Sequence, residues 1–111
     1  MKKTRLSYGI AVLLLLLAVH GSVAVVKPMA NEVTIDNFSY KPQTLTVSVG
    51  ATVTWINRDD IPHTVLSTDK TTIASPALDT DEKFSYTFTA AGTNDYYCSV
   101  HPHMKGRIIV Q

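Results

Sequence analysis

The residues with the most chemical potential lie in one short stretch near the C-terminus. Cys98, His101 and Met104 follow one another with two residues between each pair, and a separate histidine, His63, occurs upstream after Pro62. A thiolate, two imidazoles and a thioether are soft to borderline ligands, the set that forms a trigonal copper site with a long axial methionine. Three ligands from one loop need a fourth from another strand end, where His63 is predicted to lie. The spacing therefore indicates a copper site held between two segments.

Other chemistry remains open for the same residues. A tetrahedral zinc site with one cysteine and three histidines would use His63, Cys98, His101 and His103. That arrangement leaves Met104 without a role. A cysteine–histidine hydrolase would use Cys98 as its nucleophile, but it also needs an orienting Asn or Asp and a substrate cleft. A single cysteine can also be a small buried hydrophobe. The meeting of Cys, His and Met in one short loop favours the metal site.

Strands are expected to position these side chains, because apolar and polar residues alternate from Asn31 onward. Val53 and Trp55 share one face and are expected in the core, while Tyr96 and Cys98 share a face at the end of their strand. Short alternating runs separated by turn residues predict an all-β sandwich or small barrel. The expected strands are residues 32–35, 44–49, 52–57, 64–67, 83–89, 94–99 and 105–110, and residues 68–82 are expected to be irregular.

A different kind of segment precedes this region. Lys2, Lys3 and Arg5 form a positive start, and residues 10–19 form an uninterrupted apolar run, the pattern of a secretory signal. Small residues at positions 22 and 24 predict cleavage after Ala24. The alternative is an uncleaved membrane anchor over residues 8–26. We therefore expect a signal peptide in residues 1–24, one domain in residues 31–111, and a periplasmic or other extracytoplasmic location, with membrane attachment only if the signal is retained.

Composition and charge narrow the function further. The chain has 111 residues, 45% of them hydrophobic and 17% charged, which predicts one packed domain and excludes a disordered protein. From Val25 onward, seven Lys and Arg stand against nine Asp and Glu, a net charge of −2. Nucleic-acid binding requires a basic stripe, so nucleic acid is excluded as a partner. The single cysteine, Cys98, excludes an internal disulfide.

Two stretches of the sequence resemble the cupredoxins. They are residues 49–65, VGATVTWINRDDIPHTV, and residues 84–110, FSYTFTAAGTNDYYCSVHPHMKGRIIV, and they are most similar to the amicyanin group with its short ligand loop. The resemblance implies a Greek-key β-sandwich of about seven to eight strands with one type 1 copper near one end. By position, it implies imidazole ligands at His63 and His101, a thiolate at Cys98 and a weak axial ligand at Met104.

The same resemblance implies a function and roles for neighbouring residues. The protein is expected to be a one-electron carrier cycling Cu(I) and Cu(II), not an enzyme, with copper storage or delivery as the alternative. Asn57 would brace the ligand loop by hydrogen bonding. The backbone N–H of Thr64 would point toward the Cys98 sulfur.

Partners are implied in the same way. Electrons would pass to and from donor and acceptor redox proteins through the exposed edge of His101. A monomer is expected on a different ground, because a carrier of this size is more useful as a single chain. An apolar patch would surround the edge of His101, formed by Ile61, Pro62, Val100 and Pro102. His103 stands where amicyanins carry an aromatic Phe, which makes this patch more polar.

Overall fold

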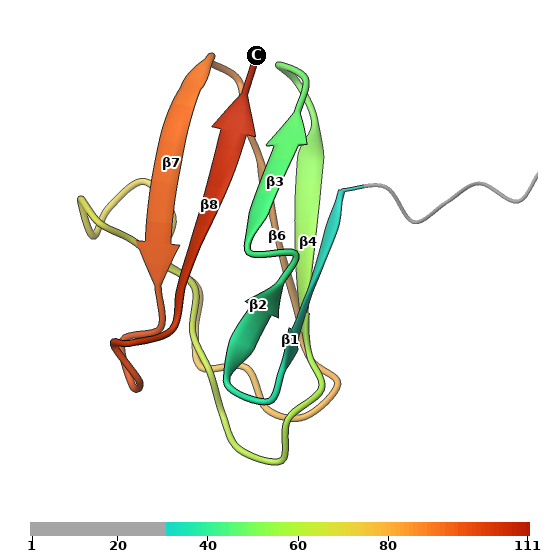
Figure 1. Cartoon of the computed structure of the whole chain (residues 1–111), viewed down its shortest axis with the longest axis vertical. Helices are drawn as coiled ribbons and strands as arrows, with labels where there is room; N and C mark the ends of the chain where they lie inside the picture. The colour runs from blue at the N-terminus through green and yellow to red at the C-terminus, as the bar shows by residue number, and fades with distance from the viewer. Residues whose placement is uncertain (1–30) are drawn as a thin grey trace, which may run out of the picture.

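The computed structural model describes residues 31–111, which form two four-stranded sheets packed face to face (Figure 1). One sheet has the order β2-β1-β4-β6 and the other β3-β8-β7-β5. The strands are β1 (Glu32–Asp36), β2 (Ser39–Lys41), β3 (Thr44–Val47), β4 (Thr52–Asn57), β5 (Leu66–Ser67), β6 (Lys83–Thr87), β7 (Gly92–Tyr97) and β8 (Lys105–Val110). The predicted all-β Greek-key sandwich is confirmed. The predicted signal segment and its cleavage position lie outside the described residues.

The sheets mix parallel and antiparallel pairs. β1 runs parallel to β4, and β3 runs parallel to β8. The pairs β1–β2, β4–β6, β5–β7 and β7–β8 are antiparallel. Among residues 31–111, no helix has the length and apolar character needed to cross a membrane.

The observed strands differ from the predicted ones at their ends. β3 stops at Val47 because Ala51 N–H donates to the Ser48 carbonyl at 3.0 Å, in a turn where Gly50 has φ +94°. β7 ends at Tyr97, so Cys98 lies just beyond the strand. Residues 64 and 65 were expected in a strand, but only Leu66–Ser67 pairs regularly with β7. Each difference leaves a loop residue where a strand residue was expected.

Strand β2 was not predicted at all, because its three residues are too short for a periodic signal. It pairs with β1 through a tight hairpin in which Asp36 faces Ser39, leaving a loop of only Asn37 and Phe38. Both loop residues have positive φ, 53° and 55°, as a type I′ turn requires. Asn tolerates this conformation, whereas an ordinary side chain such as that of Phe38 costs about 1–2 kcal/mol there. Phe38 is therefore an unfavourable residue at its position in the hairpin loop.

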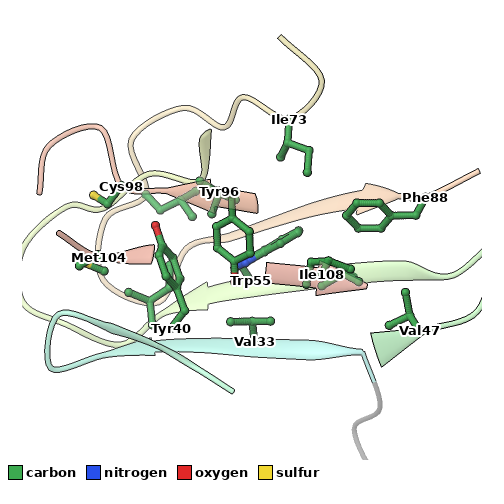
Figure 2. Close-up of a cluster of buried hydrophobic side chains, with 14 of the residues drawn as sticks. Val33, Tyr40, Val47, Trp55, Ile73, Phe88, Tyr96, Cys98, Met104 and Ile108 are labelled. Carbon is green, nitrogen blue, oxygen red and sulfur yellow. The ribbon is translucent and has the colours of Figure 1, made fainter. Parts of the chain in front are cut away.

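Aromatic side chains from both sheets fill the core (Figure 2). Trp55 of β4 meets Tyr96 of β7 edge to face, with ring centroids 5.4 Å apart, and Tyr40 of β2 meets Tyr96 at 4.7 Å. Trp55 is fully buried, as expected for a core residue. Figure 2 shows Cys98 and Met104 at one end of this core, far from Phe88 and Val47 at the other. The candidate ligands thus cap one end of the sandwich.

Gly106 allows the two central strands of one sheet to accommodate Tyr96. Gly106 is paired with Tyr96 across β7 and β8, and a Cβ at position 106 would overlap the Tyr96 ring. Gly106 is also buried. The Tyr96 ring therefore occupies the space that a side chain at position 106 would need.

We expect Gly106→Ala to lower the free energy of unfolding by about 1–3 kcal/mol, because it overpacks the core. Urea denaturation of the apoprotein, followed by Trp55 fluorescence, measures this change. Lys105→Ala is the control, since Lys105 is exposed on the same strand. Equal stability of the two variants would contradict the overlap.

Candidate metal centre

The four predicted ligands come from two loops at the same end of the sandwich (Figure 1). Cys98, His101 and Met104 lie in the loop between β7 and β8. His63 lies between β4 and β5, where its backbone pairs with Leu78. The segment that crosses from one sheet to the other thus meets the β7–β8 loop where the core ends.

The side chains of three of these residues meet closely enough for one ion. The Cys98 Sγ lies 3.7 Å from His63 Nδ1 and 3.8 Å from His101 Nδ1, and the three ligand atoms lie within 4.8 Å of one another. Metal bonds of about 2.0–2.3 Å at a trigonal angle separate two ligand atoms by about 3.8 Å. The residues present therefore fit a trigonal ion. His103 is not a member of this cluster, so the zinc set of one cysteine and three histidines is not assembled.

Hydrogen bonds close the C-terminal ligand loop tightly. Met104 N–H donates to the His101 carbonyl at 2.9 Å, and Cys98 N–H donates to the Met104 carbonyl at 3.1 Å. The first bond makes residues 101–104 a β-turn with Pro102 at its second position, where proline's fixed φ is favourable. Met104 is only 5% exposed and lies at the core end of the loop. The backbone bonds and Pro102 therefore give this short loop its shape, and the loop carries the thiol, the imidazole and the thioether.

Burial differs sharply among the ligands. His63 and Cys98 are fully buried, whereas His101 is half-buried. A fully buried sulfur is inaccessible to a substrate, which argues against the hydrolase interpretation of Cys98. The Thr64 N–H points at this sulfur from 3.4 Å, and the Thr64 hydroxyl lies 3.8 Å away. Donors of this kind suit an ionised thiolate.

The Asp59 carboxylate orients the buried imidazole. Its Oδ2 accepts from His63 Nε2 at 2.7 Å and from Phe38 N–H at 2.9 Å, and its Oδ1 accepts from Asn37 N–H at 2.6 Å. Burial opposes ionisation of Asp59, but these hydrogen bonds outweigh it and hold the pKa of the carboxyl below its usual value. An ionised carboxylate can only accept, so Nε2 carries the imidazole proton. Nδ1 is then the nitrogen that faces the Cys98 sulfur and can bind metal.

Thr64 connects the two ligand loops. Its Oγ1 accepts from Ser99 N–H at 2.8 Å and lies 2.8 Å from the Ser99 hydroxyl. The buried Tyr40 hydroxyl donates to the Thr64 carbonyl at 2.6 Å. Burial raises the pKa of Tyr40 well above its ordinary value, so the hydroxyl keeps this proton. Thr64 is thereby held between β2 and the loop that carries Cys98.

Asn57 forms hydrogen bonds around the segment that leads to His63. Its side-chain amide donates to the carbonyls of Ile61 at 2.9 Å and Leu78 at 2.8 Å, and its Oδ1 accepts from Asp59 N–H at 2.9 Å. These bonds shape the loop that leads to His63. The resemblance implied that Asn57 braces the ligand loop, and its side chain bonds to Ile61, two residues before His63, and to Leu78, which pairs with His63. Thr64 bonds to the 98–104 loop.

Two residues at this site, Asp59 and Phe38, were not predicted from the sequence. The Phe38 ring lies edge to face against both imidazoles, with centroids 5.4 Å from His63 and 5.1 Å from His101. An acidic residue near a predicted histidine ligand was the available signal for Asp59. No signal pointed to Phe38, because its approach depends on a hairpin that the periodicity did not predict.

The residues of the predicted partner patch are mostly exposed. Val100 is 55% exposed, Pro62, Pro102 and His103 are exposed, and Ile61 is half-buried. Phe38 is 49% exposed and contacts His101, so it belongs to this surface as well.

We expect Asp59→Asn to weaken copper binding by about 10–100-fold, because an amide cannot accept all three hydrogen bonds and lacks the charge that orients His63. Competition titrations of the apoprotein against a copper chelator measure this affinity. Asp60→Asn removes the same charge from the adjacent exposed residue and should bind as the unmodified protein does. An equal loss of affinity in both variants would show that net charge matters and that the orientation of His63 by Asp59 does not.

Thr64→Val should lower the free energy of unfolding by about 0.5–1.5 kcal/mol, since it removes the hydroxyl that accepts from Ser99. It should also shift the thiolate-to-copper absorption band, because Ser99 follows Cys98 directly. Thr64→Ser keeps the oxygen and is expected to preserve both properties. If valine and serine give the same stability and spectrum, the hydroxyl does not couple the loops.

Comparisons with known proteins agree with this geometry. Residues 27–111 match the family model of copper binding proteins, plastocyanin/azurin family. The chain is 40% identical over 83 residues to an amicyanin from Paracoccus denitrificans, which covers 71% of this chain and 63% of that protein. It is 34% identical over 85 residues to a plastocyanin from Scenedesmus fuscus, covering 65% of this chain and 86% of that one.

Solved structures give the same result. A reduced amicyanin variant superposes with a TM-score of 0.69 at 37% identity, over 78% of this chain and 86% of that one. An oxidized amicyanin variant gives 0.70 at 39% identity over the same shares. The donor set, its geometry and these matches agree on copper as the cofactor. The chain belongs to the plastocyanin/azurin family of copper-binding proteins.

Proposed function

We propose that the protein is a one-electron carrier that works outside the cytoplasm, with its copper held by His63, Cys98, His101 and Met104. The copper supplies the redox chemistry by alternating between Cu(I) and Cu(II). The observation that carries the proposal is the preassembled ligand set, in which the buried Cys98 sulfur lies 3.7 and 3.8 Å from two imidazole nitrogens. Ligands already in place need little movement when the charge of the metal changes.

The chain's own residues keep this arrangement rigid. Asp59 fixes the His63 ring, the Thr64 N–H is directed at the Cys98 sulfur, and two backbone bonds close the loop around His101. A rigid, closed ligand set favours transfer of an electron over bond-making chemistry, since it leaves no room for a substrate. This supports a carrier rather than an enzyme.

Electrons are proposed to enter and leave through His101. Among the three clustered ligands it is the one that reaches the surface, because His63 and Cys98 are fully buried. The exposed residues around it are mostly apolar, with His103 as a polar member. A small apolar surface suits brief contacts with redox proteins that act as donor and acceptor. Such exchange needs one copy of the chain, so we propose a monomer.

An exported location is part of the same proposal. The positive start and apolar run of residues 1–19 support secretion, with removal of residues 1–24. Copper storage or delivery remains the competing function, and copper retention during redox cycling separates the two.

The first test is the visible spectrum of the fragment that begins at Val25, after addition of Cu(II). We expect an intense blue band from the thiolate-to-copper interaction. Cys98→Ala should abolish the band, because the thiolate is the only soft anionic donor in the site. Unchanged Trp55 emission from the apo form of this variant would confirm that it folds.

Redox cycling completes the test. Ascorbate should bleach the band and ferricyanide should restore it, with copper staying bound after gel filtration. A colourless or pale product would contradict the blue copper site. A blue protein that loses copper to a mild chelator on reduction would favour delivery over electron transfer.

A further inference from the structure

Phe38 occupies a backbone position that does not suit it. The two-residue hairpin loop between β1 and β2 places Phe38 at φ +55°, where such turns favour glycine. The ring is 49% exposed, so core burial does not account for it. A residue held in an unfavourable backbone conformation near a functional site indicates a role at that site.

The contacts of the ring indicate which role. Phe38 lies edge to face against His101 at 5.1 Å and against His63 at 5.4 Å. His63 is buried and fixed by Asp59, so it does not need this support. His101 is half-buried, and within the part of the chain that the structure describes, no group accepts a hydrogen bond from its Nε2. The rings of Phe38 and His63 are what orient it.

The turn itself is fastened to the metal centre. Asp59 accepts from the N–H groups of Asn37 and Phe38 with the same carboxylate that holds His63. The backbone that carries the Phe38 ring is thereby fixed relative to the buried imidazole. The Phe38 ring therefore packs against His101 from a fixed position in the turn.

We propose that Phe38 is a positioning residue that holds the exposed His101 ring in its ligating orientation, independently of the metal–nitrogen bond. The proposal rests on the proposed electron-carrier function and deepens it. With the ring held in place, the ligand that reaches the surface does not have to reorient between oxidation states. Phe38→Leu removes the aromatic ring but keeps an apolar side chain, and Phe38→Tyr keeps the ring.

The first readout needs no copper. In the apoprotein, NMR relaxation should show a rigid His101 ring in the unmodified protein and in Phe38→Tyr, and a mobile ring in Phe38→Leu. Val49→Ala is the control, since Val49 is equally exposed but lies at the opposite end of the sandwich and should change nothing. Urea denaturation of each variant verifies folding. A His101 ring that stays rigid in Phe38→Leu would overturn the proposal.

The second readout uses the copper protein and a small oxidant, a soluble ferrocenium ion, which does not require protein docking. Oxidation of reduced Phe38→Leu should be slower by about two- to tenfold, the scale of one aromatic pair, and Phe38→Tyr should match the unmodified protein. Equal rates for all variants, or slowing only with a protein partner, would overturn positioning in favour of surface contact. Absence of a blue band from the unmodified protein would instead refute the electron-carrier function.

Discussion

The hydrogen-bonded carboxylate of Asp59 joins the parts of the molecule that form the site. One of its oxygens accepts from the His63 ring and from the backbone of Phe38, while the other accepts from Asn37. The β1–β2 hairpin, the loop after β4 and the buried imidazole are thus fixed together. Since an ionised carboxylate can only accept, the same bonds select the tautomer that presents Nδ1 toward Cys98. The protonation pattern of the ligand is set by the fold around it.

A second connection runs across the sandwich. Thr64 takes a hydrogen bond from Tyr40 of one sheet and bonds to Ser99 beside a strand of the other. The Tyr40 ring also packs against Tyr96, which in turn meets Trp55. The distance between the ligand loops is therefore determined by how the two sheets pack. Disturbing the core near Tyr96 would reach the metal centre through this chain of contacts.

Local patterns explain much of what could be predicted. Alternation located β4 and β8 correctly, and it placed Tyr96 and Cys98 on one shared face, which the structure shows to be buried. Strand β2 escaped because three residues carry no period, and its turn contains Phe where a glycine would have signalled a hairpin. The partners of the Asn57 amide could not be named in advance, because an amide can reach several carbonyls and only folding decides which are near.

The sequence by itself determined the donor atoms and their grouping. The close spacing of Cys98, His101 and Met104 restricts them to one loop, and the donor chemistry selects a soft metal. The tertiary structure alone decided that His63 faces Cys98 from the segment between β4 and β5, that Asp59 binds the far nitrogen of His63, and that the Phe38 ring packs against His101. The first and last of these contacts are made between residues that belong to different loops. Their distances depend on sheet packing and loop conformation, which no local pattern encodes.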